Sequence, residues 1–560
     1  MTPRPRFAII IMNMAASAVL PDTPPPSATR QIARAAGTVM AAFILTQLLG
    51  LVRIFIIYRA FGTGEQLDSF NAANRVAELL FTLMAGGALG SAFIPTFTGM
   101  LARENRAGAW KLASSIANLL LLVLTAVAAL AWVFAPQIVH YALFVLAPDQ
   151  PVGQEQLTVA LLQLLLPTVV IFGLSGLVMG ILNAHQKFWL PAIAPAMYSL
   201  GQILAVVFMP EWWGVTRLAI GALAGALLHL LVQLPGLLRL HGKYHLMIGL
   251  HLAEVREVLR LMGPRILGVA VVQINFIVNI IIGISLPVGS VSALALAFML
   301  MMMPQTAIAQ SIAIAAMPTF SAQVALNRRD DMRRSLALSL RGVLLLAVPA
   351  AVGLILLRTP LIQLFERGAF TAQSTRLVTW ALLWYTLGLI SHSLLEVVVR
   401  AFYALHDTRT PVSVTFAAML LNIAFSLTLP GVFERGGWLP LGGLALANTL
   451  ATTLECAALI ALLRRRLNGI QGRTIGSAAG QSAAGAAAMG LGLWGLLALT
   501  GRMPSWLVSL LGVALGSGLY ALVLALLKVP EVAQVAAVVR RRIPGLNKGG
   551  PIHKSSGEEK

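Results

Sequence analysis

Two arginines interrupt long apolar runs near the start of the chain. Arg53 lies in the run from residue 35 to 58, and Arg75 lies near the start of the run from 69 to 99. Placing an arginine under hydrocarbon costs about 2.5–3.5 kcal/mol, so it usually marks a partner or a transport pathway. Glu78 follows Arg75 by three residues on the same helical face and neutralises one charge. Two guanidiniums against one carboxylate predict a net positive pocket that suits phosphate or pyrophosphate, which arginine binds with paired donors.

The depth of the two arginines leaves two interpretations open. Each lies about six residues inside the outer end of its run, which is roughly 9 Å at 1.5 Å per residue. Both side chains could then face one cavity and hold an anionic ligand. Alternatively, a long side chain at this depth can raise its charge to the lipid headgroups and contact nothing else.

Other polar residues in apolar runs extend the candidate site. We expect Gln47, Asn183, Gln273 and Asn275 to contact the ligand, with Asn279 as a further candidate. His392 and Glu396, one helical turn apart, fit a packed structural pair better than a proton relay. The sequence has no glycine-rich phosphate loop and no metal-spaced His/Cys set. We therefore expect no enzyme activity, no metal and no cofactor.

The elements that must position these residues are membrane-spanning helices. The chain has 560 residues, of which 58% are hydrophobic and 11% charged, and a mean hydropathy of +0.84, which excludes a water-soluble protein. Its apolar runs are about 20 residues long, as an α-helix requires to cross a bilayer, and not the short alternating strands of an outer-membrane barrel. Most of the +20 net charge lies between runs, which favours lipid headgroups over nucleic acid. The one cysteine, Cys456, permits no intrachain disulfide.

We predict an all-α polytopic membrane protein with fourteen transmembrane helices. The expected spans are 35–58, 69–99, 112–134, 157–183, 190–209, 218–238, 266–286, 290–318, 342–357, 377–399, 410–430, 440–463, 474–500 and 505–527. With a cytoplasmic N-terminus, 31 of the 40 Lys and Arg residues fall on the inner side, as the positive-inside rule requires. This predicts that both termini are cytoplasmic.

The segments outside the spans have separate predictions. Residues 1–33 fit a disordered extension or an over-long start better than a cleaved signal peptide, and residues 531–560 form a basic cytoplasmic tail. Residues 251–261 form either a short amphipathic helix on the inner face or an ordinary polar connector.

Two sequence matches indicate an internal repeat. AFIPTFTGMLARENR, which begins at Ala92, matches AAMPTFSAQVALNRR, which begins at Ala315, and the segment 184–191 matches the segment 404–411 at nearly the same offset. Spans one to six then repeat as spans seven to twelve in the same orientation, which is a transporter architecture with a site between two lobes. The expected domains are an N-lobe at 34–245, a C-lobe at 246–470 and two additional spans at 471–530.

The order of several motifs resembles the MurJ/MviN family of the multidrug/oligosaccharidyl-lipid/polysaccharide exporter superfamily. The matching motifs run from about residue 34 to 468 and include LGLVR (49–53), SAFIP (91–95), GILNAHQKFWLPAIAP (180–195), GPRILGVAVVQI (263–274), LFERGAFT (364–371) and AFYALHDTRTPV (401–412). The resemblance implies two six-helix lobes around a cationic cavity, with the last two spans forming a groove for a lipid tail. It implies a flippase for lipid II, the undecaprenyl-pyrophosphate-linked peptidoglycan precursor, in the bacterial cell membrane. Cell-wall synthesis proteins are further possible partners.

The resemblance also carries over individual positions. Arg53 and Arg75 match basic positions of the family, and Asp68 matches an acidic residue in the first outer loop, so Asp68 joins the expected substrate-binding set. Several family charges are replaced, by Ile54, Gln47, Phe81 and the pair Phe298-Met299. Spans seven and eleven lack the carboxylates by which some members are thought to bind sodium, which favours a drive by the membrane potential. The missing charges leave two alternatives open, an exporter of another polyprenyl-linked intermediate and a non-transporting scaffold.

Overall fold

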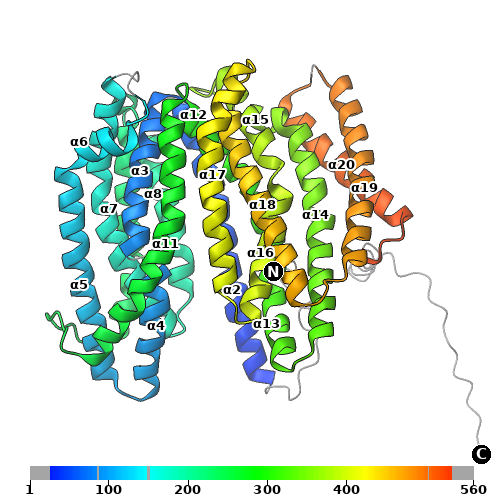
Figure 1. The fold of residues 1–560 in the computed structure, drawn as a ribbon. Coiled ribbons are helices and arrows are strands. Elements are labelled where there is room, and N and C mark those ends of the chain that lie inside the picture. Colours follow the sequence, from blue (N-terminus) through cyan, green and yellow to red (C-terminus); the bar gives the residue numbers. More distant parts are fainter. Residues whose placement is uncertain (1–25, 85–86, 148–151, 502, 532–560) are drawn as a thin grey trace, which may run out of the picture. The chain divides into compact units, whose positions relative to one another are not determined.

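The computed structural model describes residues 26–84, 87–147, 152–501 and 503–531, and every regular element in these ranges is helical (Figure 1). The prediction of an all-α membrane protein is confirmed. The first half of the chain forms α2 (Pro26–Phe61), α3 (Glu65–Met84), α4 (Gly87–Ala102), α5 (Arg106–Val133), α6 (Ala135–Gln137), the π-helical turn η1 (Ile138–Leu143), α7 (Val152–Ala184), α8 (Trp189–Phe208), the 3-10 turn η2 (Glu211–Trp213), α9 (Thr216–Leu231), α10 (Leu234–Leu238) and α11 (Ala253–Ser285).

The second half continues with longer helices and one further π-helical turn. They are α12 (Ser290–Gln305), η3 (Thr306–Gln310), α13 (Ser311–Ala325), α14 (Arg329–Gln363), α15 (Ala372–Thr386), α16 (Leu389–Ala404), α17 (Arg409–Arg435), α18 (Leu441–Arg466), α19 (Gly472–Leu499) and α20 (Ser505–Leu526). The expected extension 1–33 lies mostly, and the basic tail almost wholly, outside the described residues.

Each of the fourteen expected spans falls on helix, but their number is not confirmed. In the described part of the chain, ten segments are long and apolar enough to cross a bilayer, or eleven if α15 and α16, bent by 45°, form one broken span. The expected second span falls on α3 and α4, which are described up to residue 84 and from residue 87. Residues 253–261 are neither a separate surface helix nor a connector, because they form the beginning of α11. A continuous helix pairs its own backbone N–H and C=O groups, as any segment that enters the lipid must do.

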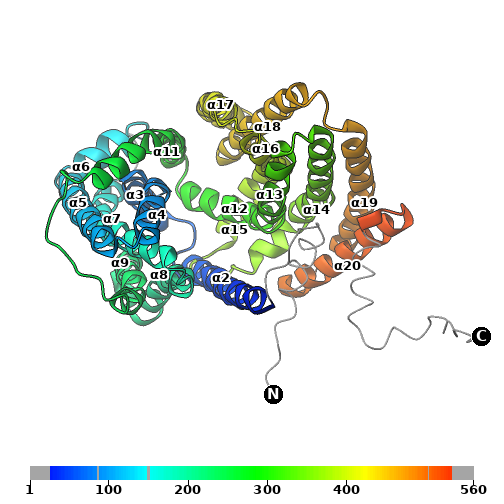
Figure 2. The same ribbon diagram turned by 90° about the horizontal axis from the view of Figure 1, so that it is seen from below.

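The chain divides into two compact units. The first contains residues 1–299, 365–385 and 415–451, and the second contains 300–364, 386–414 and 452–560. In the first unit, α7 packs against α3, α4, α5 and α9 (Figure 2). The helix that carries Arg75, α3, itself packs against α7, α11 and α4 of the same unit.

Small residues bring α8 and α9 close together in the first unit. A Cβ atom added to Gly201 of α8 would lie 2.4 Å from the backbone of Gly225 in α9, and one added to Gly221 would lie 2.7 Å from Ala205. In a lipid environment helices associate through such close van der Waals packing, since apolar burial gives little driving force. The spacing Gly221-x-x-x-Gly225 therefore holds α8, and with it Tyr198 and Gln202, against α9.

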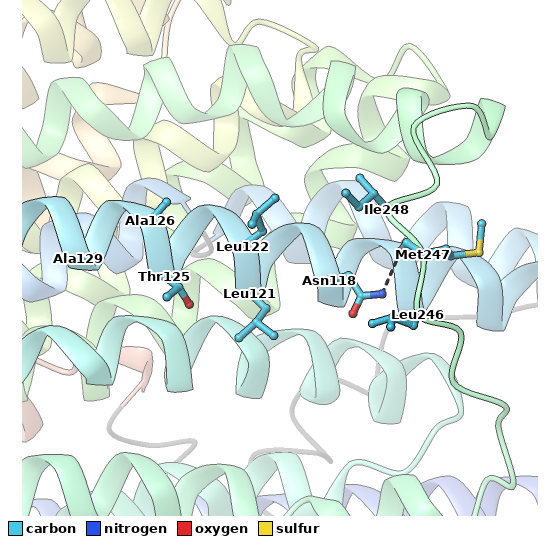
Figure 3. Close-up of a pocket in the computed structure, with 9 residues that line it drawn as sticks. All are labelled: Asn118, Leu121, Leu122, Thr125, Ala126, Ala129, Leu246, Met247 and Ile248. Carbon is cyan, nitrogen blue, oxygen red and sulfur yellow. Dashed lines mark hydrogen bonds between the residues drawn. The ribbon is translucent and has the colours of Figure 1, made fainter.

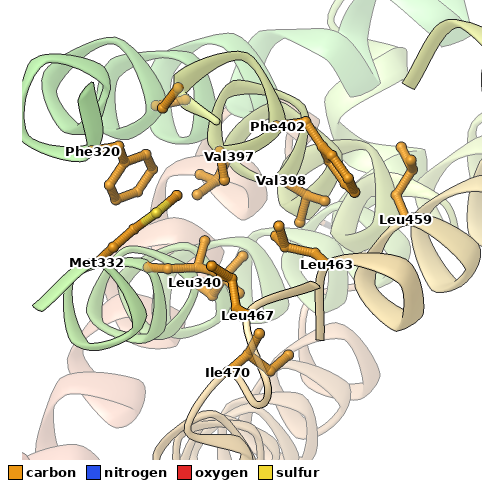
Figure 4. Close-up of a cluster of buried hydrophobic side chains, with 14 of the residues drawn as sticks. Phe320, Met332, Leu340, Val397, Val398, Phe402, Leu459, Leu463, Leu467 and Ile470 are labelled. Carbon is orange, nitrogen blue, oxygen red and sulfur yellow. The ribbon is translucent and has the colours of Figure 1, made fainter. Parts of the chain in front are cut away.

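An apolar cluster joins α13, α14, α16 and the end of α18 in the second unit (Figure 4). Phe320, Met332, Val397 and Leu459 are fully buried within it. A second cluster packs α19 and α20 on α14, where the Tyr520 hydroxyl donates to the Leu345 carbonyl oxygen at 2.6 Å. These clusters hold the C-terminal helices on the second unit.

Candidate functional site

The Arg53 side chain is held inside the first unit by α8. Its Nη1 donates to Oε1 of Gln202 at 2.9 Å, and its guanidinium carbon lies 5.9 Å from the centre of the Tyr198 ring. Gln202 in turn donates from Nε2 to the Tyr198 hydroxyl at 3.1 Å. The Nε of Arg53 is buried and has no partner among the described residues. Arg53 is therefore fixed by neutral groups and keeps both its charge and a free donor.

Arg75 has a different set of neighbours. Its Nη1 lies 2.9 Å from Oε2 of Glu78, and its guanidinium carbon lies 3.9 Å from the centre of the Phe276 ring on α11. The Arg75 side chain is 18% exposed and that of Glu78 is 48% exposed. A cation over an aromatic face is stabilised by the ring electrons, so Arg75 is oriented from two sides.

An aromatic row leads from Tyr198, beside Arg53, to the helix that carries Arg75. On α3, Phe81 lies one to two turns after Arg75 and Glu78 and packs against Phe172 of α7, with ring centres 5.6 Å apart. Phe172 packs edge-on against Tyr198, with ring centres 5.3 Å apart. The two arginines and the carboxylate carry a net charge of about +1 in an aromatic setting, which favours an anionic ligand.

Asp68 is fully engaged by the first turn of α12. It is buried and accepts hydrogen bonds from the backbone N–H of Gly289 at 2.6 Å and of Ser292 at 2.7 Å, and from the Ser292 hydroxyl at 2.6 Å. The Tyr58 hydroxyl donates to the Ser292 carbonyl oxygen at 2.7 Å. A carboxylate at a helix N-terminus satisfies free donors and complements the helix dipole. Its contacts in the structure thus connect α3 with α12.

Further contacts join α2 and α15 at the same end of the first unit as Asp68. The Thr63 hydroxyl donates to the Ser374 hydroxyl at 2.8 Å, and the Ala369 amide donates to the Arg59 carbonyl oxygen at 3.0 Å. Gly62 has a φ of +63°, and a Cβ there would lie 2.2 Å from the Ala369 carbonyl oxygen. Hydrogen bonds therefore join α2, α3, α12 and α15 at this end of the first unit.

The candidates on α11 belong to a polar cluster with α17. The Asn279 amide donates to the Asn275 carbonyl oxygen at 2.8 Å and to Oδ1 of Asn422 at 3.2 Å, and Ser426 donates to Asn279 at 3.3 Å. Gln273 is buried, and its Oε1 has no partner within the part of the chain that the structure describes. Phe276, the ring beneath Arg75, also lies on α11, so the polar cluster and the Arg75 group share this helix.

Two expected residues are not brought to this group. The Gln47 side chain is exposed and lies on another face of α2 from Arg53. Asn183 lies at the opposite end of α7 from Gln154, whose carbonyl oxygen faces Ser69 of α3. At 1.5 Å per residue, Asn183 is separated from Arg75 by roughly 30 Å along the direction of the helix axes.

Glu396 in the second unit pairs with Arg400, one turn further along α16, and accepts from Nε2 of Gln305 at 3.1 Å. These contacts indicate a structural ion pair.

Four polar residues around the arginines and Asn279 were not expected from the sequence, namely Tyr198, Gln202, Asn422 and Ser426. A polar or hydroxyl-bearing residue inside an apolar run was the available signal for each.

Comparisons with known proteins agree on one family. A family model described as lipid II flippase MurJ matches residues 57–513. The chain is 30% identical over 428 residues to the lipid II flippase MurJ of Burkholderia cenocepacia, covering 74% of this chain and 82% of that protein. It is 29% identical over 544 residues to the probable lipid II flippase MurJ of Synechocystis, covering 91% and 97%.

Solved structures show the same fold. A structure described as lipid II flippase MurJ in an inward closed conformation superposes with a TM-score of 0.73 at 23% identity, covering 90% of this chain and 98% of that one. An inward-facing multidrug transporter of the MATE family superposes with a TM-score of 0.63 at 15% identity, covering 83% and 99%.

Proposed function

The chain belongs to the lipid II flippase MurJ family, and we propose that it moves lipid II from the inner to the outer leaflet of the bacterial cell membrane. The relatives that carry this name match most of the chain. The observation that supports the proposal most directly is Arg53, a cation kept inside the protein by Gln202 and Tyr198 with one donor free. A pyrophosphate would supply the missing anion.

Transport proceeds by alternating access and involves no covalent chemistry. Arg53 and Arg75 bind the pyrophosphate, and Glu78 orients Arg75 for this contact. Gln273 and Asn275 lie beside Phe276, where neutral amides can bind the sugar hydroxyl groups. The contacts of Asp68 with α12 and of Thr63 with Ser374 close the outer end and break when the site opens outward.

The remaining predictions are carried forward in this proposal. Both termini are cytoplasmic, the N-lobe and C-lobe alternate about the site, and the membrane potential drives the cycle. The last two spans, α19 and α20, form the groove for the lipid tail, and they pack on α14. A pocket of about 380 Å³, lined in part by Leu356, Arg358, Thr500 and Val508, lies between these helices and supports this placement.

The test is complementation of a strain depleted of its own lipid II flippase. R53A/R75A is expected to abolish growth, because the site loses its cationic donors. R59A removes a charge from the exposed outer end of the same helix and is the matched control, which should grow normally. Equal growth of both variants, at equal protein levels, would show that the arginines are not needed for transport.

A second function is export of another polyprenyl-linked intermediate. It is favoured by α12, where Phe298 packs edge-on against Tyr385 with ring centres 5.3 Å apart and no charged group stands at positions 298 and 299. Preference of the purified protein in nanodiscs for a lipid pyrophosphate that lacks the peptidoglycan sugars would select this function. If the protein is instead a scaffold without transport, a variant with a blocked site should restore growth of the depleted strain as well as the parent protein does.

A further inference from the structure

An extended segment between α10 and α11 lies along the surface of α5 in the first unit (Figure 3). Asn118 of α5 fixes it by donating from Nδ2 to the carbonyl oxygens of His245 at 3.0 Å and Met247 at 2.9 Å, and by accepting from the Tyr244 hydroxyl. The His245 amide donates to the Ser114 hydroxyl at 3.1 Å. One face of α5 therefore supplies the polar groups that satisfy this segment, which we call the strap (residues 242–250).

From Leu246 to Leu250, side chains of the strap point alternately away from α5 and toward it, and those that point away are apolar. Leu246, Ile248 and Leu250 are 89%, 46% and 52% exposed, whereas Gly249 between two of them is buried. A Cβ atom at Gly249 would lie 2.2 Å from the Ser115 hydroxyl, so the inner side is pressed against α5. Exposed apolar side chains in a row suit contact with acyl chains better than contact with water.

A groove of about 660 Å³ begins where the strap crosses α5 beside Asn118 and continues along α5 to Ala129 (Figure 3). Small residues form its floor on α5, namely Thr125, Ala126 and Ala129, and Leu246 and Ile248 form its wall. From Leu121 to Ala129 the groove extends about 12 Å at 1.5 Å per residue. This length accommodates roughly half of one acyl chain.

The end of the groove toward the inner membrane face is cationic. Lys111 precedes Asn118 by two helical turns on α5, and Lys243 lies next to Tyr244 in the strap. Gly242 packs directly on Trp110, since a Cβ there would lie 2.1 Å from the indole ring, and this brings the two lysines into the same region. Both are exposed, and neither has an ion-pair partner among the described side chains. Trp110 and Tyr244 are of the type that marks the headgroup level.

From this arrangement we propose that the groove binds an anionic glycerophospholipid of the inner leaflet. One acyl chain lies between α5 and the strap, and the phosphate contacts Lys111 and Lys243. The charge of the two lysines complements a phosphodiester, because basic side chains near the membrane surface attract anionic lipid headgroups. The site is formed by α5 and the strap and is separate from the Arg53 and Arg75 groups on α2 and α3, so it does not depend on the proposed function.

Native mass spectrometry of the full-length protein with added phosphatidylglycerol tests this inference. K111A/K243A should weaken the tightest phosphatidylglycerol adduct about tenfold, and A126F, which fills the groove from an exposed position of α5, should do the same. R103A/R106A removes two exposed cations at the same end of α5 and is the matched control, which should retain the adduct. Phosphatidylcholine should show no such adduct in any of these proteins.

Two outcomes would overturn the inference. Unchanged binding of phosphatidylglycerol in both K111A/K243A and A126F would exclude the groove as its site. Tighter binding of a polyprenyl diphosphate than of phosphatidylglycerol, lost in K111A/K243A, would assign the groove to the transported lipid instead.

Discussion

At the residue scale, the sequence identified the charged groups but not the neutral groups that hold them. Arg53, Arg75 and Glu78 stand out because charge within an apolar run is costly. Their partners Gln202, Tyr198 and Phe276 are compatible with packing in any helix, so only the structure reveals them. Asp68 was expected at the site by resemblance, and its contacts lie instead with the N-terminus of α12.

Gln202 provides a sharp test of the free charge on Arg53. Q202E would place a carboxylate 2.9 Å from the Arg53 guanidinium and neutralise it without changing side-chain size. We expect transport to fall at least tenfold in Q202E while the protein remains folded, because a buried ion pair competes with the anionic ligand. Q202M, which removes the hydrogen bond and adds no charge, is the control and should lose less activity. Both are measured as lipid II translocation in proteoliposomes.

At the element scale, the inferred repeat agrees with the backbone of the matched loops. Glu104 and Asn327 stand at matched positions of the first sequence match and have φ values of +58° and +55°, and Gln186 and His406 of the second match both have +57°. The loops also make the same hydrogen bonds, for example Asn105 N–H to Met100 O and Arg328 N–H to Gln323 O. At each of these four positions, a residue other than glycine adopts the left-handed backbone conformation that ends a helix. The matched segments therefore share a backbone conformation as well as a sequence pattern. The lobe boundaries remain a prediction.

The contact of Asp68 with α12 predicts a conformational effect. D68N exchanges charge-assisted hydrogen bonds for weaker ones, so the N-terminal ends of α3 and α12, which we propose to face the outer side, should separate more readily. In a C456S background, a cysteine replacing Ser374 should react faster with a membrane-impermeant maleimide in D68N than with Asp68 present. An equal rate would show that Asp68 does not control access at this end.

The turn between α16 and α17 predicts a pH dependence. Asp407 accepts from the Thr410 hydroxyl at 2.7 Å and the Thr410 amide at 3.0 Å and pairs with Arg466, and these contacts lower the pKa of its carboxyl, those with Thr410 most. A lowered pKa adds stability above about pH 4, the unfolded value, and this stability is lost as pH falls through the folded pKa. T410V should therefore lower the unfolding temperature in detergent by a few degrees at pH 7, and this difference should shrink as the pH falls below about 4. An equal loss at both pH values would exclude this origin.

At the scale of the whole molecule, apolar length predicted the helices well, and the expected number of fourteen spans stays a prediction. Two expected spans contain turns within the described residues, namely 218–238, which falls on α9 and α10, and 377–399, which falls on the bent pair α15 and α16. Proline explains part of this pattern only, since Pro95 and Pro318 lie inside helices. Hydropathy records whether a segment is buried in lipid, and it contains no information on where packing bends that segment.

The central claim is that Arg53 binds the anionic headgroup of a transported lipid. Equilibrium binding of lipid II to the protein in nanodiscs tests it without the complexity of a transport cycle. R53A should weaken binding about tenfold or more relative to the parent, while R59A should bind as the parent does. Equal affinity of R53A and the parent protein would contradict the claim.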